Sequence, residues 1–599
     1  MFQTFTVTAR PEQGPPRLAA LRAKLAEAGL TGFLVPRADA HQGEYVAPHD
    51  ERLAWLTGFT GSAGFCIVLP EVAGVFIDGR YRVQVKSQVD LAHFTPVPWP
   101  DVKPGDWLKE KLSQGVIGFD PWLHTVDEIG KIEAALEGSA ITLRPTENFV
   151  DAVWPDQPPP PRGRAIPHPL EFAGESAQAK RARLAADLRG AGQKAAVITL
   201  PDSVSWLLNI RGSDVARNPV VHAFALLHDD GRLTLFIDLA KLDAAVQEHL
   251  GPEVTLAPPA DFTAALQALA GPVRVDRATA PLAVWQILEA AGVKTVPGQD
   301  PCLLPKARKN AAEIDGMRTA HLRDAAAMVE FLAWLDANAP GELTEIDVVT
   351  KLEGFRRATN ALREISFETI CGAGPHGAIM HYRVTEETNR PLGSGELLVV
   401  DSGGQYPDGT TDITRTIALG EPPAEARACF TRVLQGMIAI SRLRWPKGLA
   451  GRDLDPFARY QLWLAGQDFD HGTGHGVGAF HSVHEGPQRL SRTSEVPFEP
   501  GMILSNEPGY YREGAFGIRL ENLVVVEPAS DLPGADPRPM LSFETLTYVP
   551  IDRRLIDASL LSPAERSWLD AYHREVRERI GPRVSAAALD WLEAATQPL

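Results

Sequence analysis

The sequence has few cysteines, no clustered basic charge and no long apolar run. Four cysteines occur among 599 residues, far apart and without Cys-x-x-Cys spacing, which indicates neither a zinc–thiolate site nor a disulfide framework. The formal net charge is −17 without a long Lys/Arg run, so polyanion binding is disfavoured. No segment approaches the roughly 18 apolar residues of a membrane span, and the start lacks a secretory signal pattern. We expect a cytoplasmic protein that binds neither nucleic acid nor membranes.

The composition is that of a globular protein, and the length requires several domains. Hydrophobic residues make up 44% and charged residues 23% of the chain, which are ordinary values for a folded protein. A chain of 599 residues exceeds one hydrophobic core and predicts two to four domains. The proline-rich segment 154–169 suits an extended linker, and a second boundary lies near 300–310. The predicted domains are residues 1–160, 161–303 and 304–599.

The first two predicted domains repeat one order of elements. An amphipathic helix end, a glycine and an apolar strand occur at residues 25–35 and again at 188–198. Two further pairs of similar segments follow in the same order: 55–62 with 206–213, and 75–81 with 235–241. We interpret the two domains as copies of one α/β unit, with chance similarity of short apolar strings as the alternative. Neither copy shows clustered metal-ligand residue types.

The third predicted domain begins with a helix, continues mainly with strands and ends with helices. Apolar residues near 3.6 periodicity predict a long helix over residues 311–341. Strand patterns follow at residues 396–400, 410–419, 502–507 and 517–527. Near the end, Ser562, Pro563 and Glu565 form the pattern of a helix start with a capping box.

Four carboxylates stand out against these strands. Asp401 ends an apolar strand, and Asp412 begins the strand that returns from a turn, so the two face each other across a hairpin. Glu507 ends another apolar strand, and Glu521 is predicted in the middle of a strand. A buried carboxylate needs a partner. Arg519 shares the strand face of Glu521, and an ion pair between them is the structural alternative.

The segment HGTGHGVGAFHSVHEGP, residues 471–487, carries four histidines. Its glycines and the lack of a Glu after the first histidine exclude the helical HExxH site of zinc proteases and predict strand and turn. We expect His481 to be a core or surface residue. Together with four carboxylates, the cluster is a ligand set for two divalent cations such as Mn²⁺ or Co²⁺. Such a pair predicts hydrolysis of an amide, ester or phosphoester.

These motifs resemble those of the aminopeptidase P family, the Xaa-Pro aminopeptidases, in its long three-domain form. The resemblance rests on the histidine segment, on DSGGQYPDGTTDITRT and on NEPGYYREGAFGIRLEN, and it extends to GFTGSAG and DGRY near the start. It implies an α/β (α+β) protein in which two creatinase-like N-terminal α/β domains precede a C-terminal pita-bread catalytic domain. It also implies two metal ions per chain, most often Mn²⁺, with Co²⁺ or Zn²⁺ as alternatives.

The resemblance assigns five metal ligands, all intact in this sequence. Asp401 would chelate one ion, whereas His475 and Glu507 would bind the other. Asp412 and Glu521 would bridge the two ions. Glu507 would also act as the general base towards the attacking water.

The same resemblance assigns residues that are not ligands. His381, His471 and His484 match histidines that position the substrate and stabilise the developing oxyanion. Arg519 matches an arginine beside the metal-bound carboxylates. Arg80 in DGRY matches a residue that could reach a substrate.

The predicted activity is release of the first residue from peptides with proline second, by a homodimer. A prolidase would cleave dipeptides and usually has one N-terminal domain, whereas this chain repeats that unit. A metal-free peptide-binding protein of the same fold would show substituted ligands and often an acidic tail, and neither occurs here. The segment Pro375-His376 receives no role.

Overall fold

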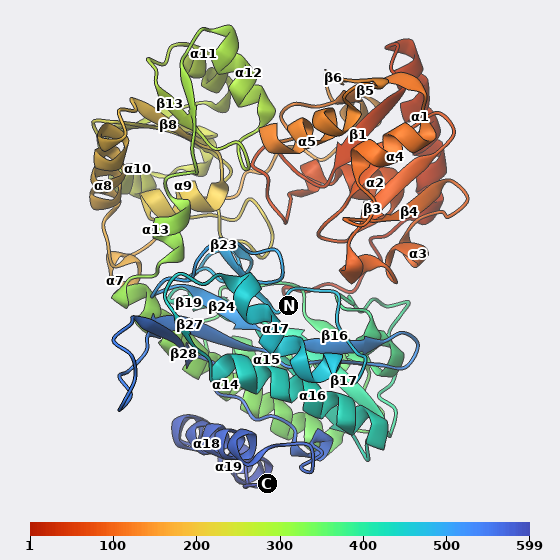
Figure 1. The fold of residues 1–599 in the computed structure, drawn as a ribbon, viewed down its shortest axis with the longest axis vertical. Coiled ribbons are helices and arrows are strands. Elements are labelled where there is room, and N and C mark those ends of the chain that lie inside the picture. Colours follow the sequence, from red (N-terminus) through yellow and green to blue (C-terminus); the bar gives the residue numbers. More distant parts are fainter. The chain divides into compact units, whose positions relative to one another are not determined.

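The computed structural model describes residues 1–599, which form two compact units (Figure 1). The N-terminal unit is Thr8–Lys306, and the C-terminal unit combines Met1–Val7 with Ala307–Leu599. The sequence had placed the first seven residues with the first domain. They join the C-terminal unit because Phe2 N donates to the buried Glu353 Oε1 at 2.8 Å.

The N-terminal unit contains two six-stranded sheets of the same topology, ordered β4-β3-β2-β1-β5-β6 and β12-β11-β10-β8-β13-β14. The first sheet consists of β1 (Gly32–Pro36), β2 (Phe65–Val68), β3 (Ala73–Ile77), β4 (Phe94–Pro98), β5 (Gln114–Phe119) and β6 (Ala140–Pro145). The second consists of β8 (Ala195–Ile198), β10 (Phe224–His228), β11 (Leu233–Phe236), β12 (Val254–Ala257), β13 (Val273–Val275) and β14 (Thr295–Pro297). Corresponding strands pair with the same direction in both sheets. This agreement supports the interpretation of a duplicated unit.

Each copy opens with the predicted helix and strand. Helix α1 (Gly14–Glu27) buries three leucines on one face, and Gly29, in the left-handed region at φ 65°, ends it before β1. Helix α8 (Ala177–Gly190) begins at Ser176, whose side chain accepts from Ala179 N, and leads into β8. The 3.6 periodicity therefore packs each helix onto its own sheet.

The C-terminal unit combines long helices with antiparallel sheets. Its longer helices are α14 (Ala311–Asn338), α15 (Glu345–Arg357), α16 (Ala424–Ser441) and α17 (Gly451–Trp463). One sheet has the order β16 (Ile370–Ala373), β17 (Glu396–Ser402), β20 (Ile413–Leu419). Another has the order β21 (Arg444–Pro446), β28 (Met540–Thr545), β27 (Asn522–Pro528), β24 (Ile503–Asn506), β22 (Gly474–Gly476), β23 (Glu485–Leu490). Within this unit, α14, α15 and α16 lie along one side of the strands (Figure 1).

Two strand predictions each merged two strands. The stretch 410–419 contains the end of β19 (Gly409–Thr410), which pairs with β18 (Gly404–Tyr406), and then β20. The stretch 517–527 forms two strands, β26 (Phe516–Arg519) and β27, because β26 pairs with β25 (Gly509–Arg512) in a hairpin of its own. The chain changes sheets at residues 520–521. Glu521 lies in this break, where its N–H donates to Thr414 O at 3.1 Å.

The chain closes with α18 (Pro563–Ile580) and α19 (Ala586–Ala595). The capping box expected at the start of α18 is present, with Ser562 and Glu565 satisfying each other's backbone N–H. None of the helices combines the length and apolarity needed to cross a bilayer.

Candidate metal centre

The four predicted carboxylates come from strand ends that converge. Asp401 lies in β17, and Asp412 directly precedes β20, which pairs with β17 in antiparallel register. Glu507 follows β24 and Glu521 precedes β27, and these two strands also pair. Asp401, Asp412 and Glu521 offer ligand oxygens within 4.8 Å of one another, and Glu507 and Glu521 form a similar group with a histidine. The hairpin geometry expected for the first pair is confirmed.

That histidine is His475 on the short strand β22. Its Nε2 lies 3.4 Å from both Asp412 Oδ2 and Glu507 Oε1, and its Nδ1 lies 2.9 Å from Gly476 O. A carbonyl only accepts, so Nδ1 carries the hydrogen and the Nε2 lone pair faces the two carboxylates. A Cβ at Gly474 would lie 1.9 Å from Ser505 O, so glycine lets β22 approach β24 this closely.

The donor set fits a pair of divalent cations. Acceptor atoms 3.4 Å apart repel one another unless a cation lies between them, and about 3.4 Å is the separation of tetrahedral ligands about 2.1 Å from an ion. Asp401 Oδ1 and Glu521 Oε1 are buried without a hydrogen-bond partner. A metal-binding histidine commonly donates its other N–H to a backbone carbonyl, as His475 does.

The electrostatics point the same way. Burial, with the neighbouring Asp412, raises the pKa of Asp401 to about 6. Burial also raises the pKa of Asp412 to about 6 and the pKa of Glu507 above its usual range. Burial and the three other carboxylates raise the pKa of Glu521 well above its usual range. Crowded, buried negative charge is unfavourable, and a bound dication would lower all four pKa values.

Arg519 pairs with Asp401, not with Glu521. Its Nη2 donates to Asp401 Oδ2 at 2.7 Å, whereas Glu521 Oε2 accepts from Thr414 Oγ1 at 2.8 Å. The alternative of an ion pair between Arg519 and Glu521 is not found, because Glu521 lies outside β26. Arg519 Nη1 also donates to Tyr511 Oη at 2.7 Å, which ties the arginine to a residue that the sequence analysis missed.

Tyr511 extends this chain of hydrogen bonds to His471. Its hydroxyl lies 2.8 Å from His471 Nε2, and His471 Nδ1 lies 2.7 Å from Gly472 O. Nδ1 therefore donates to the carbonyl, and the tyrosine hydroxyl donates to Nε2. Burial raises the pKa of Tyr511 to about 12, so this hydroxyl keeps its proton at neutral pH. The run PGYY, directly after Glu507, was the available signal.

The other histidines of the predicted site lie in the C-terminal unit. The ring of His484 lies 4.2 Å from that of His475, and His484, His475 and Asp412 form one possible ligand group. His381 follows the short helix η6 (Gly374–Ala378), which contacts the Arg519 strand β26. His481 is buried, which agrees with the first of its two predicted positions, core or surface.

Arg80 belongs to the N-terminal unit. It lies in the short helix η3 (Gly79–Tyr81), where its Nη2 donates to Asp78 Oδ2 at 2.7 Å. Its predicted contact with substrate stays a prediction.

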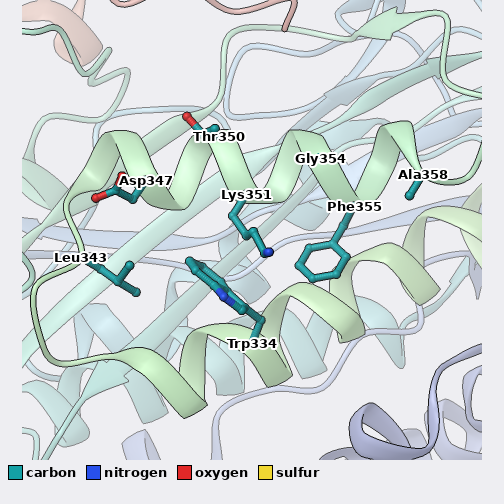
Figure 2. Close-up of a pocket in the computed structure, with 8 residues that line it drawn as sticks. All are labelled: Trp334, Leu343, Asp347, Thr350, Lys351, Gly354, Phe355 and Ala358. Carbon is teal, nitrogen blue, oxygen red and sulfur yellow. The ribbon is translucent and has the colours of Figure 1, made fainter.

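A surface pocket of about 580 Å³ lies elsewhere on the C-terminal unit, between α14 and α15 (Figure 2). Lys351 Nζ lies 5.3 Å from the ring centroids of both Trp334 and Phe355. The one carboxylate in its lining, Asp347, caps the start of α15 through Thr344. The pocket therefore lacks the paired acids and histidines of the strand-end cluster.

Comparison with known families agrees with this architecture. Residues 315–528 match the family described as "Metallopeptidase family M24", and residues 539–599 match the "C-terminal region of peptidase_M24". Residues 17–153 and 156–313 each match a "Creatinase/Prolidase N-terminal domain". The fold and the cluster thus define a metal-dependent hydrolase with an M24 domain and two creatinase-type domains.

Similar proteins cover nearly the whole chain. "Aminopeptidase P2" of Arabidopsis thaliana is 37% identical over 97% of this chain and 88% of its own length. "Probable Xaa-Pro aminopeptidase P" of Paracoccidioides lutzii is 38% identical over 97% of this chain and 99% of its own. A solved X-prolyl aminopeptidase of Caenorhabditis elegans, described as a cytosolic enzyme with a di-nuclear active site, superimposes with a TM-score of 0.92 and 33% identity, covering 98% of this chain and 100% of that one. The chain belongs to the aminopeptidase P family.

Proposed function

We propose that this chain is a cytoplasmic dinuclear-metal aminopeptidase that hydrolyses the N-terminal Xaa-Pro bond of peptides longer than dipeptides. The observation that carries the proposal is the buried group of four carboxylates and His475 at the converging strand ends. Two creatinase-type domains, rather than the one usual in prolidases, favour the aminopeptidase over the dipeptidase reading.

The proposed metal ligands are the five residues that the resemblance to the aminopeptidase P family assigns. Asp401, Asp412, His475, Glu507 and Glu521 would together hold the two ions, with Mn²⁺ as the native metal and Co²⁺ or Zn²⁺ as substitutes. The metal pair, when bound, polarises the scissile carbonyl and lowers the pKa of water. Arg519 holds Asp401 in place and offsets part of the negative charge.

The protein's own residues carry the proton and orient the substrate. Glu507 takes the proton of the attacking water and passes it to the leaving proline nitrogen. His484 donates to the developing oxyanion, and His381 orients the peptide. Because both ring nitrogens of His471 are engaged with Gly472 and Tyr511, His471 serves mainly to position the Tyr511–Arg519 pair. The scissile Xaa-Pro bond is a tertiary amide without an N–H, so a site that requires no hydrogen bond from that nitrogen can select it.

Cleavage of an Xaa-Pro-Yaa tripeptide and of the matching Xaa-Pro dipeptide tests the proposal, with chelator-treated protein before and after Mn²⁺ addition. We expect Mn²⁺-dependent release of the first residue from the tripeptide and little cleavage of the dipeptide. Faster cleavage of the dipeptide would establish a prolidase, and a lack of activity with every divalent ion would indicate a peptide-binding protein. Glu507→Gln should abolish turnover. The metal content of this variant is measured separately, because Glu507 is also a proposed ligand.

We also propose that the protein is a homodimer that forms through α17. Four large apolar side chains lie exposed at helical spacing along and just beyond this helix: Phe457 at 48%, Tyr460 at 55%, Trp463 at 43% and Leu464 at 67%. A contiguous apolar face of this kind is unusual on a monomer and suits self-association. Trp463→Glu should yield a monomer in light scattering, whereas the exposed Leu239→Glu in the N-terminal unit should not. A dimeric Trp463→Glu protein would refute this interface.

The proposal also includes a division into three domains and a contact between Arg80 and the substrate. We propose three domains: residues 1–160 without the first seven and residues 161–303 are the two α/β copies, and residues 304–599 with the first seven form the M24 domain. Arg80→Ala should raise KM for peptides without lowering metal content if the arginine contacts substrate. An unchanged KM would limit Arg80 to its ion pair with Asp78.

A further inference from the structure

A second group of metal-ligand side chains lies in the N-terminal unit. It consists of Asp39, which follows β1, Asp50 in the short helix η2 (Pro48–Asp50), and His222, which precedes β10. One ligand atom of each lies within 4.8 Å of the others. Asp39 and Asp50 belong to the first α/β copy and His222 to the second. The group therefore forms only where the copies meet, so the sequence of either copy alone does not show it.

Asp39 is the centre of this group and is 1% exposed. Its Oδ1 accepts from the backbone N–H groups of His41 at 2.9 Å and Gly43 at 3.1 Å, which fixes the plane of the carboxylate. Its Oδ2 is buried without a hydrogen-bond partner and faces His222 Nε2 at 3.3 Å. A fixed, buried and unsatisfied carboxylate oxygen is costly unless a cation or a proton compensates.

The geometry favours a cation. The 3.3 Å separation is close to the 3.4 Å between His475 and its carboxylates, and both match neighbouring ligands about 2.1 Å from one ion. Burial outweighs the nearby carboxylates and lowers the pKa of His222, which favours the neutral imidazole that a metal requires. Burial, and then the neighbouring Asp39, raises the pKa of Asp50 above its usual range.

The surroundings resemble a metal site in a further respect. Arg52 Nη1 donates to Asp50 Oδ1 at 2.8 Å and Arg52 Nε donates to Asp151 at 2.6 Å, so the arginine orients Asp50 from outside the cluster. The side chains of Asp50 and His222 are 12% and 9% exposed, which leaves an approach for an ion and water. One imidazole, two carboxylates and no thiolate suit Zn²⁺, Mn²⁺ or Co²⁺ better than a soft ion.

We propose that Asp39, Asp50 and His222 bind one divalent transition-metal ion per chain, in addition to the two of the strand-end centre, and that this ion fastens the two α/β copies together. We assign the ion a structural role, because holding the two copies together accounts for all three ligands. Its binding energy adds to the stability of the N-terminal unit.

Metal counting on the full chain tests the proposal. Wild type, His222→Gln and a control, His228→Gln, which changes another histidine on the same stretch of chain, are stripped with chelator and dialysed against Zn²⁺. We expect three Zn²⁺ per chain in wild type and control and two in His222→Gln. Zn²⁺ should also raise the unfolding temperature of the N-terminal unit in wild type and control only. Asp39→Asn, which keeps an oxygen for the two backbone N–H groups, serves as the second variant.

Three results would overturn the proposal. Two ions per chain in wild type would mean that the Asp39–His222 contact holds no metal. Three ions in both His222→Gln and Asp39→Asn would place the third ion elsewhere. Loss of the third ion from His228→Gln as well would identify adventitious binding to exposed histidines.

Discussion

The buried ion pair between Lys309 and Glu485 is the most sharply testable structural contact near the centre. Lys309 precedes α14, and Glu485 directly follows His484 at the start of β23. Their side chains are 1% and 0% exposed. Lys309→Met keeps the aliphatic stem and removes the charge, which leaves the Glu485 carboxylate buried without its cation. Breaking one partner of such a pair costs about 3–5 kcal/mol.

The assay is unfolding of the C-terminal unit, followed by calorimetry and by urea. A loss of this size should lower its unfolding temperature by roughly 10 °C. The double variant Lys309→Met/Glu485→Gln removes both charges and should recover more than half of the loss, because paired removal avoids the orphaned charge. Arg452→Ala is the matched control: its pair with Glu495 is exposed, and the change should cost less than about 1 kcal/mol.

Two results would refute the reasoning. A cost below about 1 kcal/mol for Lys309→Met would mean that Glu485 finds water or a proton instead of its cation. A double variant no more stable than Lys309→Met would mean that lost packing, rather than lost charge, explains the effect. If the expected result holds, peptide turnover by Lys309→Met should also fall, because Lys309 anchors Glu485, the residue next to His484.

Three further predictions follow from other contacts of the C-terminal unit. Tyr511→Phe should lower kcat by about 10- to 100-fold without loss of metal, because it breaks the hydrogen-bonded chain from Arg519, and unchanged kcat would contradict that role. His376 lies just before His381 in the chain, and its Nδ1 lies 2.9 Å from the buried Glu345 Oε1. His376→Leu should therefore lower kcat/KM, and His376→Asn should restore most of it. Equal effects of the two variants would argue against a role of His376 in positioning His381. Burial, then Arg415, lowers the pKa of His573 to about 3, below the unfolded value of about 6.5. Stability should therefore be full above pH 6.5 and fall towards pH 3, with a shallower fall in His573→Gln; identical pH profiles would contradict this reasoning.

Local sequence patterns predicted the elements whose causes are local. The capping box at Ser562 needs residues only three positions apart, so the start of α18 could be read directly. The carboxylates Asp401 and Glu507 could be placed at strand ends because each follows an apolar run. The repeated order of segments likewise anticipated two sheets of one topology.

Contacts set by chain reversal could not be read in this way. The sequence shows Arg519 and Glu521 two residues apart, yet the break between β26 and β27 gives them different partners. The hairpin of β25 and β26 then brings Tyr511 to Arg519. Whether an apolar stretch is one strand or two depends on which sheet offers hydrogen bonds, and periodicity alone does not contain that information.

The two clusters differ in how they are encoded, and this difference explains why one was found. The strand-end centre draws its residues from segments that are each unusual, with carboxylates beside apolar strands and histidines among glycines. Asp39 and His222 are each an isolated polar residue beside a strand, and only the packing of two copies gives Asp39 Oδ2 a facing nitrogen at 3.3 Å. A duplicated unit creates such an interface whenever its copies pack side by side. A ligand group shared between copies therefore has to be sought in the structure, where burial and an unsatisfied oxygen mark it.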